Sequence, residues 1–111
     1  MEAKAVARFV RISPRKVRPV THLIKGKAVD EALAVLRFAP NRAARILAKV
    51  VESAAANAEH NMEVVRDTLR VAKVFVDSGP SVRRLHARAR GRGDVIKKRS
   101  SHITVVVQDT E

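Results

Sequence analysis

The chain contains no cysteine, no tryptophan and no tyrosine, and its 111 residues include only three phenylalanines. Without cysteine it can form no disulfide framework, no thiolate zinc site and no cysteine nucleophile. So few aromatic side chains cannot supply the row of stacking platforms that many single-strand binders use. We expect no transmembrane helix, because no run of about 18 apolar residues occurs. We also expect no secretory signal, because charged residues interrupt the first positions.

Acidic residues are also scarce, 11 against 23 Lys and Arg, which gives a net charge of +12. Hydrophobic residues make up 46% of the chain, enough for the small core of one domain spanning residues 1–111. Such a basic chain is not typical of a neutral metabolic domain. The charge indicates a polyanionic partner, with nucleic acid first and an anionic membrane second.

The basic residues fall mainly in two segments. Residues 1–40 hold nine bases and three acids, and residues 80–99 hold eight bases and one acid, whereas residues 41–79 are nearly balanced. Arginine outnumbers lysine fifteen to eight. Because the planar guanidinium suits phosphate oxygens and base edges, this bias favours contacts with nucleic acid.

The first half of the sequence reads as a strand followed by helices. Loose alternation predicts a strand over 2–10. Ser13-Pro14 predicts a helix start with the serine side chain as the cap, and this helix is expected to bend at Pro19 and to close at Gly26.

Two further helices follow. Asp30-Glu31 favours the start of a short second helix, because acids suit the positive end of the helix dipole, and Pro40 ends it. Apolar residues at three- and four-residue spacing predict a third helix over 41–60, with a loop around His60-Asn61.

The second half reads as strands. β-favouring residues fill 70–77 and 103–107, and the simplest connection is a very long hairpin with arms 70–85 and 95–107. The predicted fold class is α+β, with three helices packed on a small antiparallel sheet and a long protruding β-hairpin. We call residues 80–98 the arm.

The arm is too poor in apolar residues to hold itself rigid. Its large apolar side chains are Val82, Leu85, Val95 and Ile96 only, and an isolated two-stranded ribbon is marginally stable in water. Its crowded cations repel one another. We therefore expect a mobile tip in the free protein that becomes ordered among the phosphates of a folded RNA.

Two stretches resemble the signatures of the bacterial large-subunit ribosomal protein L22 family. The first runs Arg11-Ile12-Ser13-Pro14-Arg15-Lys16-Val17-Arg18, with Gly26-Lys27 and Glu31-Ala32-Leu33 after it. The second runs Ala87-Arg88-Ala89-Arg90-Gly91-Arg92, with Lys98-Arg99 and Ser101-His102-Ile103-Thr104-Val105 after it. The resemblance covers essentially the whole chain.

This resemblance implies a cytoplasmic structural constituent of the large ribosomal subunit that organises large-subunit rRNA during assembly. It implies neighbouring ribosomal proteins as partners, and a hairpin tip (His86, Ala87, Arg88, Ala89 and Arg90) that lines the nascent-peptide exit tunnel. It implies no cofactor, metal, membrane or small-molecule substrate. The rRNA-binding residues implied are Arg8, Arg11, Ser13, Arg15, Lys16, Arg18, Lys25, Lys27, Arg83, Arg84, Arg88, Arg90, Arg92, Lys97, Lys98, Arg99, Ser101 and His102.

Other readings have less support. The four histidines lack metal-ligand spacing, and adjacent residues of a strand, such as Ser101 and His102, point to opposite faces and do not form a catalytic pair. We therefore expect no enzymatic activity. A sequence-nonspecific DNA-binding nucleoid protein is the main alternative, and it predicts tight duplex-DNA binding by a dimer. A regulator of an acidic protein predicts binding that survives nuclease treatment.

Overall fold

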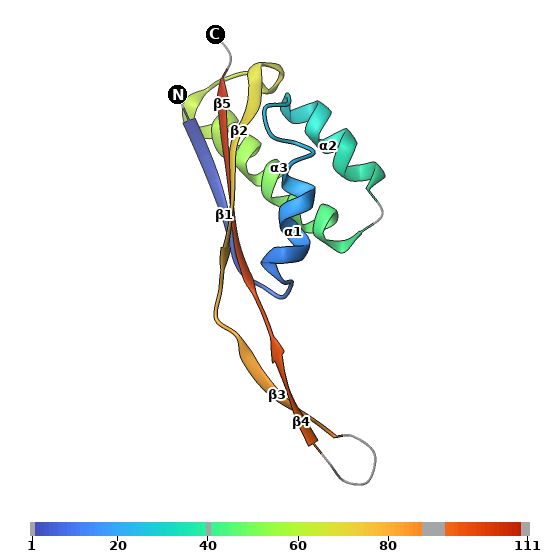
Figure 1. Ribbon diagram of the computed structural model, residues 1–111. Helices are drawn as coiled ribbons and strands as arrows, with labels where there is room; N and C mark the ends of the chain where they lie inside the picture. Colours follow the sequence, from blue (N-terminus) through green and yellow to red (C-terminus); the bar gives the residue numbers. More distant parts are fainter. Residues whose placement is uncertain (1, 40, 88–92, 110–111) are drawn as a thin grey trace.

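Three antiparallel strands form the sheet of the body, and the last strand of the chain lies at its centre (Figure 1). The computed structural model describes residues 2–39, 41–87 and 93–109, and over 82–87 and 93–98 it describes the backbone alone. Strands β1 (Glu2–Val10) and β2 (Leu69–Ser78) flank β5 (Ser101–Asp109). The three strands predicted from alternation and β propensity are confirmed to within two residues at each end.

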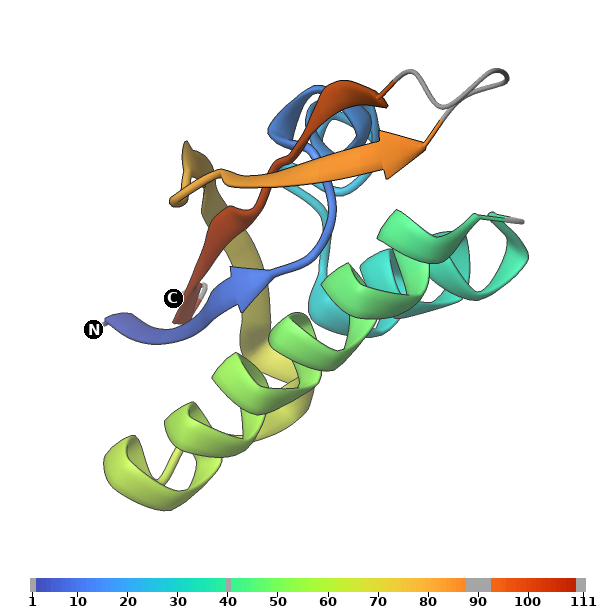
Figure 2. The ribbon, with the colours of Figure 1, turned by 90° about the horizontal axis from the view of Figure 1, so that it is seen from below.

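The helices cover one face of this sheet (Figure 2). They are α1 (Pro14–Thr21), α2 (Val29–Phe38) and α3 (Arg42–Met62). Helix α3 packs on β1 and β5, α1 packs on β2, and α2 packs on α3. The predicted arrangement of three helices on a small antiparallel sheet is therefore confirmed.

The core lies between α3 and the sheet. Ile103, Val105 and Val107 of β5 are fully buried at alternate positions, as the two-residue period of a strand requires. The buried side of α3 is rich in small residues, which allow the helix to lie close to the strands: Ala43, Ala44, Leu47, Val50, Val51, Ala54, Ala55 and Ala58.

Helix α3 begins where the sequence predicts. The Asn41 side chain accepts a hydrogen bond of 2.8 Å from the Ala44 N–H, which satisfies one of the free amides of the first turn. The loop predicted at His60-Asn61 is wrong, because the helix continues to Met62. It ends at Glu63, whose φ of 52° is left-handed.

Helix α1 is shorter than predicted. The α-helix ends at Thr21, two residues after Pro19, and the chain continues in tighter turns, in which the Leu23 N–H bonds the Val20 carbonyl. Gly26 therefore does not close the helix itself, contrary to the prediction, but ends these later turns, with a left-handed φ of 78°. The predicted side-chain cap is wrong: the Ser13 side chain makes no capping bond, and its carbonyl instead accepts from the Lys16 N–H at 3.0 Å.

Beyond the body, β3 (Val82–Ala87) pairs with β4 (Gly93–Lys98) in a separate two-stranded sheet. This ribbon continues β2 and β5 and projects from one end of the body (Figure 1). The hairpin predicted as continuous is therefore interrupted, at residues 79–81 on one side and 99–100 on the other. The molecule measures 63 × 25 × 17 Å, and its radius of gyration is 16.8 Å, whereas a compact chain of this length has about 13 Å.

Candidate nucleic-acid interface

The turn between β1 and α1 gathers the first group of predicted RNA-binding residues. Pro14, Val17 and Val20 of α1 are buried against the core. The helical period therefore places the intervening cations on the outside, and each of the following is exposed: Arg8, Arg11, Arg15, Lys16, Arg18 and Lys25. The structure thus brings six of the predicted cations to the surface on β1, α1 and the turns that flank α1.

Three hydrogen bonds fix the position of this group. The Arg18 guanidinium donates a hydrogen bond of 3.4 Å to the Val76 carbonyl, which ties α1 to β2. The Gly26 N–H donates to the Val71 carbonyl, and the Val71 N–H donates to the Lys27 carbonyl, each at 2.9 Å. The segment with Lys25 and Lys27 is therefore held to the rim of the sheet.

Four acidic residues of α2 and α3 form ion pairs with Arg66 or Lys27. The Arg66 guanidinium, in the short 3-10 turn η1 (Arg66–Thr68), lies 3.1 Å from Asp30, 3.4 Å from Glu52 and 4.0 Å from Glu59. Lys27 pairs with Glu31 at 3.4 Å, so its charge is partly compensated. Among the described ion pairs none involves the six exposed cations of the first group. The positive charge of these six residues can therefore attract a polyanion.

The root of the arm (Gly79 to Ser81 and Arg99 to His102) is held by hydrogen bonds. The Gly79 N–H donates to the Ser100 carbonyl at 3.0 Å, and the Ser100 hydroxyl donates to the Pro80 carbonyl at 2.7 Å. A Cβ on Gly79 would lie 2.5 Å from Ser100 Oγ, so only glycine fits this approach without a shift.

Ser101 and His102 point to opposite faces, as predicted. Ser101 is fully buried, and its hydroxyl donates to the Ile12 carbonyl at 2.6 Å. The structure therefore does not bring Ser101 to the surface with the other predicted RNA-binding residues, and we leave it out of the interface. His102 is half-buried and its Nδ1 accepts from the Phe9 N–H at 3.1 Å. Ser13 is also half-buried, whereas Arg99 is exposed.

The second group of predicted residues lies on the arm. Its backbone register places Arg83 opposite Lys97, Arg84 opposite Ile96, and Lys98 opposite Val82. The predicted tip begins in β3, where His86 is opposite Asp94 and Ala87 opposite Gly93. The remaining predicted positions lie outside the described residues: Arg88, Ala89, Arg90 and Arg92.

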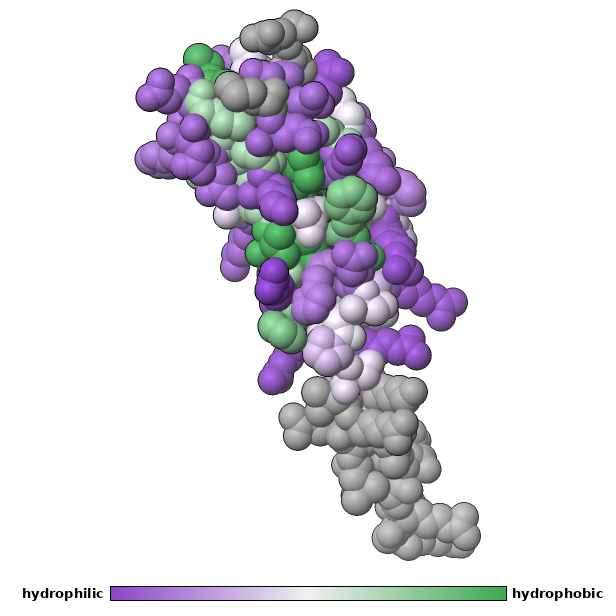
Figure 3. All heavy atoms as spheres, turned by 90° about the vertical axis from the view of Figure 1, so that its left-hand side faces the viewer, coloured by the Kyte–Doolittle hydropathy of each residue, from purple (hydrophilic) through white to green (hydrophobic). Residues whose placement is uncertain are grey.

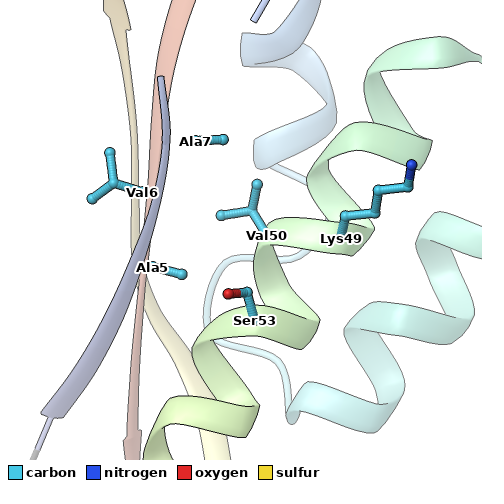
Figure 4. A pocket seen from close by; sticks show the side chains of 6 residues that line it. All are labelled: Ala5, Val6, Ala7, Lys49, Val50 and Ser53. Carbon is cyan, nitrogen blue, oxygen red and sulfur yellow. The ribbon is translucent and has the colours of Figure 1, made fainter. Parts of the chain in front are cut away.

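The described surface offers little to a small molecule or a metal. A recess of about 190 Å³ between β1 and α3 is lined by Ala5, Ala7 and Val50 (Figure 4), and ligand pockets are typically larger, about 300–1,000 Å³. Within the described chain no three His, Asp or Glu residues gather as metal ligands. None of the three helices has the length and hydropathy of a membrane span in that part of the chain.

Sequence reasoning missed two features of this surface. Arg66 is a hub for three carboxylates, and no local pattern links residues so far apart in the chain. Phe9 lies exposed at a left-handed position beside His102. Its place in an alternating strand, between Arg8 and Val10, gave no signal of that conformation.

Comparisons with known proteins identify a family and several similar chains. The family model described as Ribosomal protein L22p/L17e matches residues 5–108. The large ribosomal subunit protein uL22 of Desulforamulus reducens is 61% identical over 109 residues, which cover 98% of this chain and 96% of that protein. The same protein of Thermoanaerobacter pseudethanolicus is 60% identical over the full length of both chains. That of Thermus thermophilus is 57% identical over 96% of this chain and 95% of its own.

Proposed function

Because the chain belongs to the ribosomal protein L22p/L17e family, we propose that it organises large-subunit rRNA during assembly and that its arm tip lines the nascent-peptide exit tunnel. Membership makes the chain a structural constituent of the large ribosomal subunit and so a component of the translation apparatus. We further propose which residues bind rRNA and where the arm lies in the subunit. In this role the protein is structural and catalyses no reaction.

The observation that carries the proposal is the positive charge on a ribbon of only two strands. Strands β3 and β4 pair only with each other, and the register sets the cations Arg83 and Lys97 directly opposite. Like charges at facing positions destabilise a strand pair. An environment of phosphates removes that cost and releases counterions, which favours RNA that surrounds the arm on several sides.

The body contributes a second group of contacts. The exposed cations at the start of α1 lie on the body, and a second group of cations lies on the arm. The protein can therefore bridge two regions of rRNA. The proposed body contacts are Arg8, Arg11, Ser13, Arg15, Lys16, Arg18, Lys25, Lys27, Arg99 and His102. The proposed arm contacts are Arg83, Arg84, Arg88, Arg90, Arg92, Lys97 and Lys98, with residues 86–90 at the tunnel wall.

Sucrose-gradient sedimentation tests the rRNA part of the proposal. We expect the protein to sediment with large subunits and to leave them only at high salt, since phosphate contacts weaken steeply as salt rises. Nuclease digestion should release it. Binding to duplex DNA with the same affinity as to large-subunit rRNA would favour the nucleoid alternative, and binding that survives nuclease would favour an acidic protein partner.

Photo-cross-linking tests the tunnel part. A photoreactive residue in place of Arg88 should cross-link to a stalled nascent peptide in assembled ribosomes. The same residue in place of Arg42, which is exposed at the start of α3, is the control and should not. Cross-linking of the peptide from neither position would contradict the proposed course of the arm.

A further inference from the structure

All three phenylalanines of the chain lie at the surface. Phe9 is 63% exposed, Phe38 83% and Phe75 48%, so the core is built from aliphatic side chains. Phenylalanine is usually among the most buried residues, because it gains much from leaving water. Exposure of every aromatic ring therefore suggests that some of these rings contact a partner.

Phe9 is distinguished from the other two by its backbone. Its φ is 57°, in the left-handed region. It lies where the β1–β5 register shifts, so that Arg8 and Phe9 together occupy the place opposite His102. A bulky side chain costs free energy in this region and glycine does not. Strain held at an exposed side chain is typical of a functional position.

His102 holds Phe9 in place. The Phe9 N–H donates to His102 Nδ1 at 3.1 Å, and the two rings meet edge to face, with centroids 5.0 Å apart and planes at 89°. Because Nδ1 accepts, the neutral imidazole carries its proton on Nε2. The imidazole also lies near Gly79, where Cε1 is 3.3 Å from the position of an added Cβ. The pair is thus braced from the root of the arm.

The surface around this pair is the open face of the sheet. Across the three strands Val6, Thr104 and Phe75 lie side by side, and Val6 points away from α3 (Figure 4). Figure 3 shows apolar side chains on this face surrounded by polar ones. Arg8 and Arg11 flank Phe9 in sequence, Arg99 precedes His102 by three residues, and all three are exposed.

We propose that Phe9, braced by His102, stacks on an unpaired base of large-subunit rRNA at the root of the arm. An aromatic ring beside guanidinium groups matches the chemistry of single-stranded RNA, whose bases stack on the ring while its phosphates bind the cations. The positive charge favours RNA over an apolar protein surface. The inference rests on the proposed function and specifies one contact within it.

Equilibrium binding to an in vitro transcript of large-subunit rRNA at several salt concentrations tests this contact. Phe9→Leu should weaken binding by roughly 5- to 140-fold, the range for loss of one stacked base, with an unchanged salt dependence. Phe9→Trp should retain binding. Phe38→Leu removes an exposed ring from α2 and is the matched control, expected to bind as the wild type does. Arg8→Ala should instead reduce the salt slope by about one charge.

Phe9→Gly is a second variant, which tests the contact if Phe9→Leu folds poorly. Glycine adopts a left-handed φ without strain, so this variant should fold and still bind as weakly as Phe9→Leu. Wild-type affinity in both variants would overturn the stacking contact and leave the proposed function intact. Failure of the wild-type protein to bind the transcript would instead contradict the proposed function.

Cross-linking shows whether RNA or a protein contacts Phe9 in the assembled subunit. With p-benzoylphenylalanine in place of Phe9 in assembled subunits, we expect cross-links to rRNA. Cross-links to a neighbouring protein alone would overturn the inference.

Discussion

At the scale of single residues, three consecutive residues at the root of the arm, Ser100, Ser101 and His102, each bond a different part of the chain. Ser101 is buried and bonds the Ile12 carbonyl, whereas His102, the next residue, faces the open side and accepts from the Phe9 N–H. Ser100 bonds the Pro80 carbonyl across the two strands. The side-chain bonds of Ser100, Ser101 and His102, together with the backbone bond from the Gly79 N–H to the Ser100 carbonyl, hold the start of the arm to the body.

Gly79→Ala tests this dependence. The new Cβ would lie 2.5 Å from Ser100 Oγ, so the hydroxyl must rotate away from the Pro80 carbonyl. Unfolding in urea should show a loss of about 1–2 kcal/mol, typical of a broken hydrogen bond with a partner left unpaired. In the double variant with Ser100→Ala the loss should be smaller than the sum of the two single losses, because the bond is already gone.

Gly26→Ala is the matched control. An added Cβ there meets nothing within 4 Å, and only its φ of 78° opposes the change. Its cost, about 1–2 kcal/mol from the backbone alone, should add to that of Ser100→Ala. Simple additivity for Gly79→Ala as well would contradict the role given to Ser100.

At the scale of elements, the part of the hairpin in the body (β2 and β5) and the part in the arm (β3 and β4) differ in their neighbours. Strand β5 has a neighbour on each side and α3 on one face, whereas β3 and β4 have only each other. A ribbon of two strands is marginally stable in water. We therefore expect the conformation of the arm, unlike that of the body, to depend on the RNA around it.

Hydrogen exchange tests this difference. In the isolated protein the amides of 83–86 and 94–97 should exchange much faster than those of 103–107, because local opening of the ribbon costs little. On binding folded rRNA the arm amides should become protected. Equal protection of the arm in the free and bound protein would contradict the idea that RNA orders it.

At the scale of the whole molecule, charge and shape separate the surface into different regions. Arg66 engages three carboxylates around η1, so part of the helical side is internally compensated. The cations at the start of α1 have no such partners among the described ion pairs, and eight more belong to residues 80–99. An elongated molecule with these two cationic regions is suited to bridge separate parts of a folded RNA.

The double substitution Arg88→Ala and Arg90→Ala tests the arm as an RNA contact. Affinity for large-subunit rRNA should fall, and the salt slope should decrease by about two charges, while the melting temperature should change little. Arg37→Ala with Arg42→Ala removes the same charge from exposed helix positions and should leave both affinity and slope nearly unchanged. Equal effects of the two pairs would mean that only net charge matters, and a large fall in melting temperature would make Arg88 and Arg90 structural.

The sequence by itself determined the local elements and the family. Strand alternation, the apolar spacing of α3 and the turn residues at Asn41 and Gly26 act over a few neighbouring residues, so their physics is readable from the chain. The same holds for the basic segments, because charge along the chain needs no fold to be counted. The motifs around Ser13-Pro14 and Arg88–Arg92 carried the resemblance for the same reason.

Only the tertiary structure decided which of those residues reach the surface together. Ser101 lies on the buried face of β5, as the strand period implies, but the partner of its hydroxyl is the Ile12 carbonyl, far away in sequence. The Ser13 side chain makes no capping bond, and its backbone carbonyl accepts from the Lys16 N–H. Arg66 forms ion pairs with three carboxylates from two helices. Phe9, in a left-handed conformation, bonds His102, which lies 93 positions along the chain. Such contacts depend on strand register and on packing between distant segments, and no local pattern in the sequence specifies either.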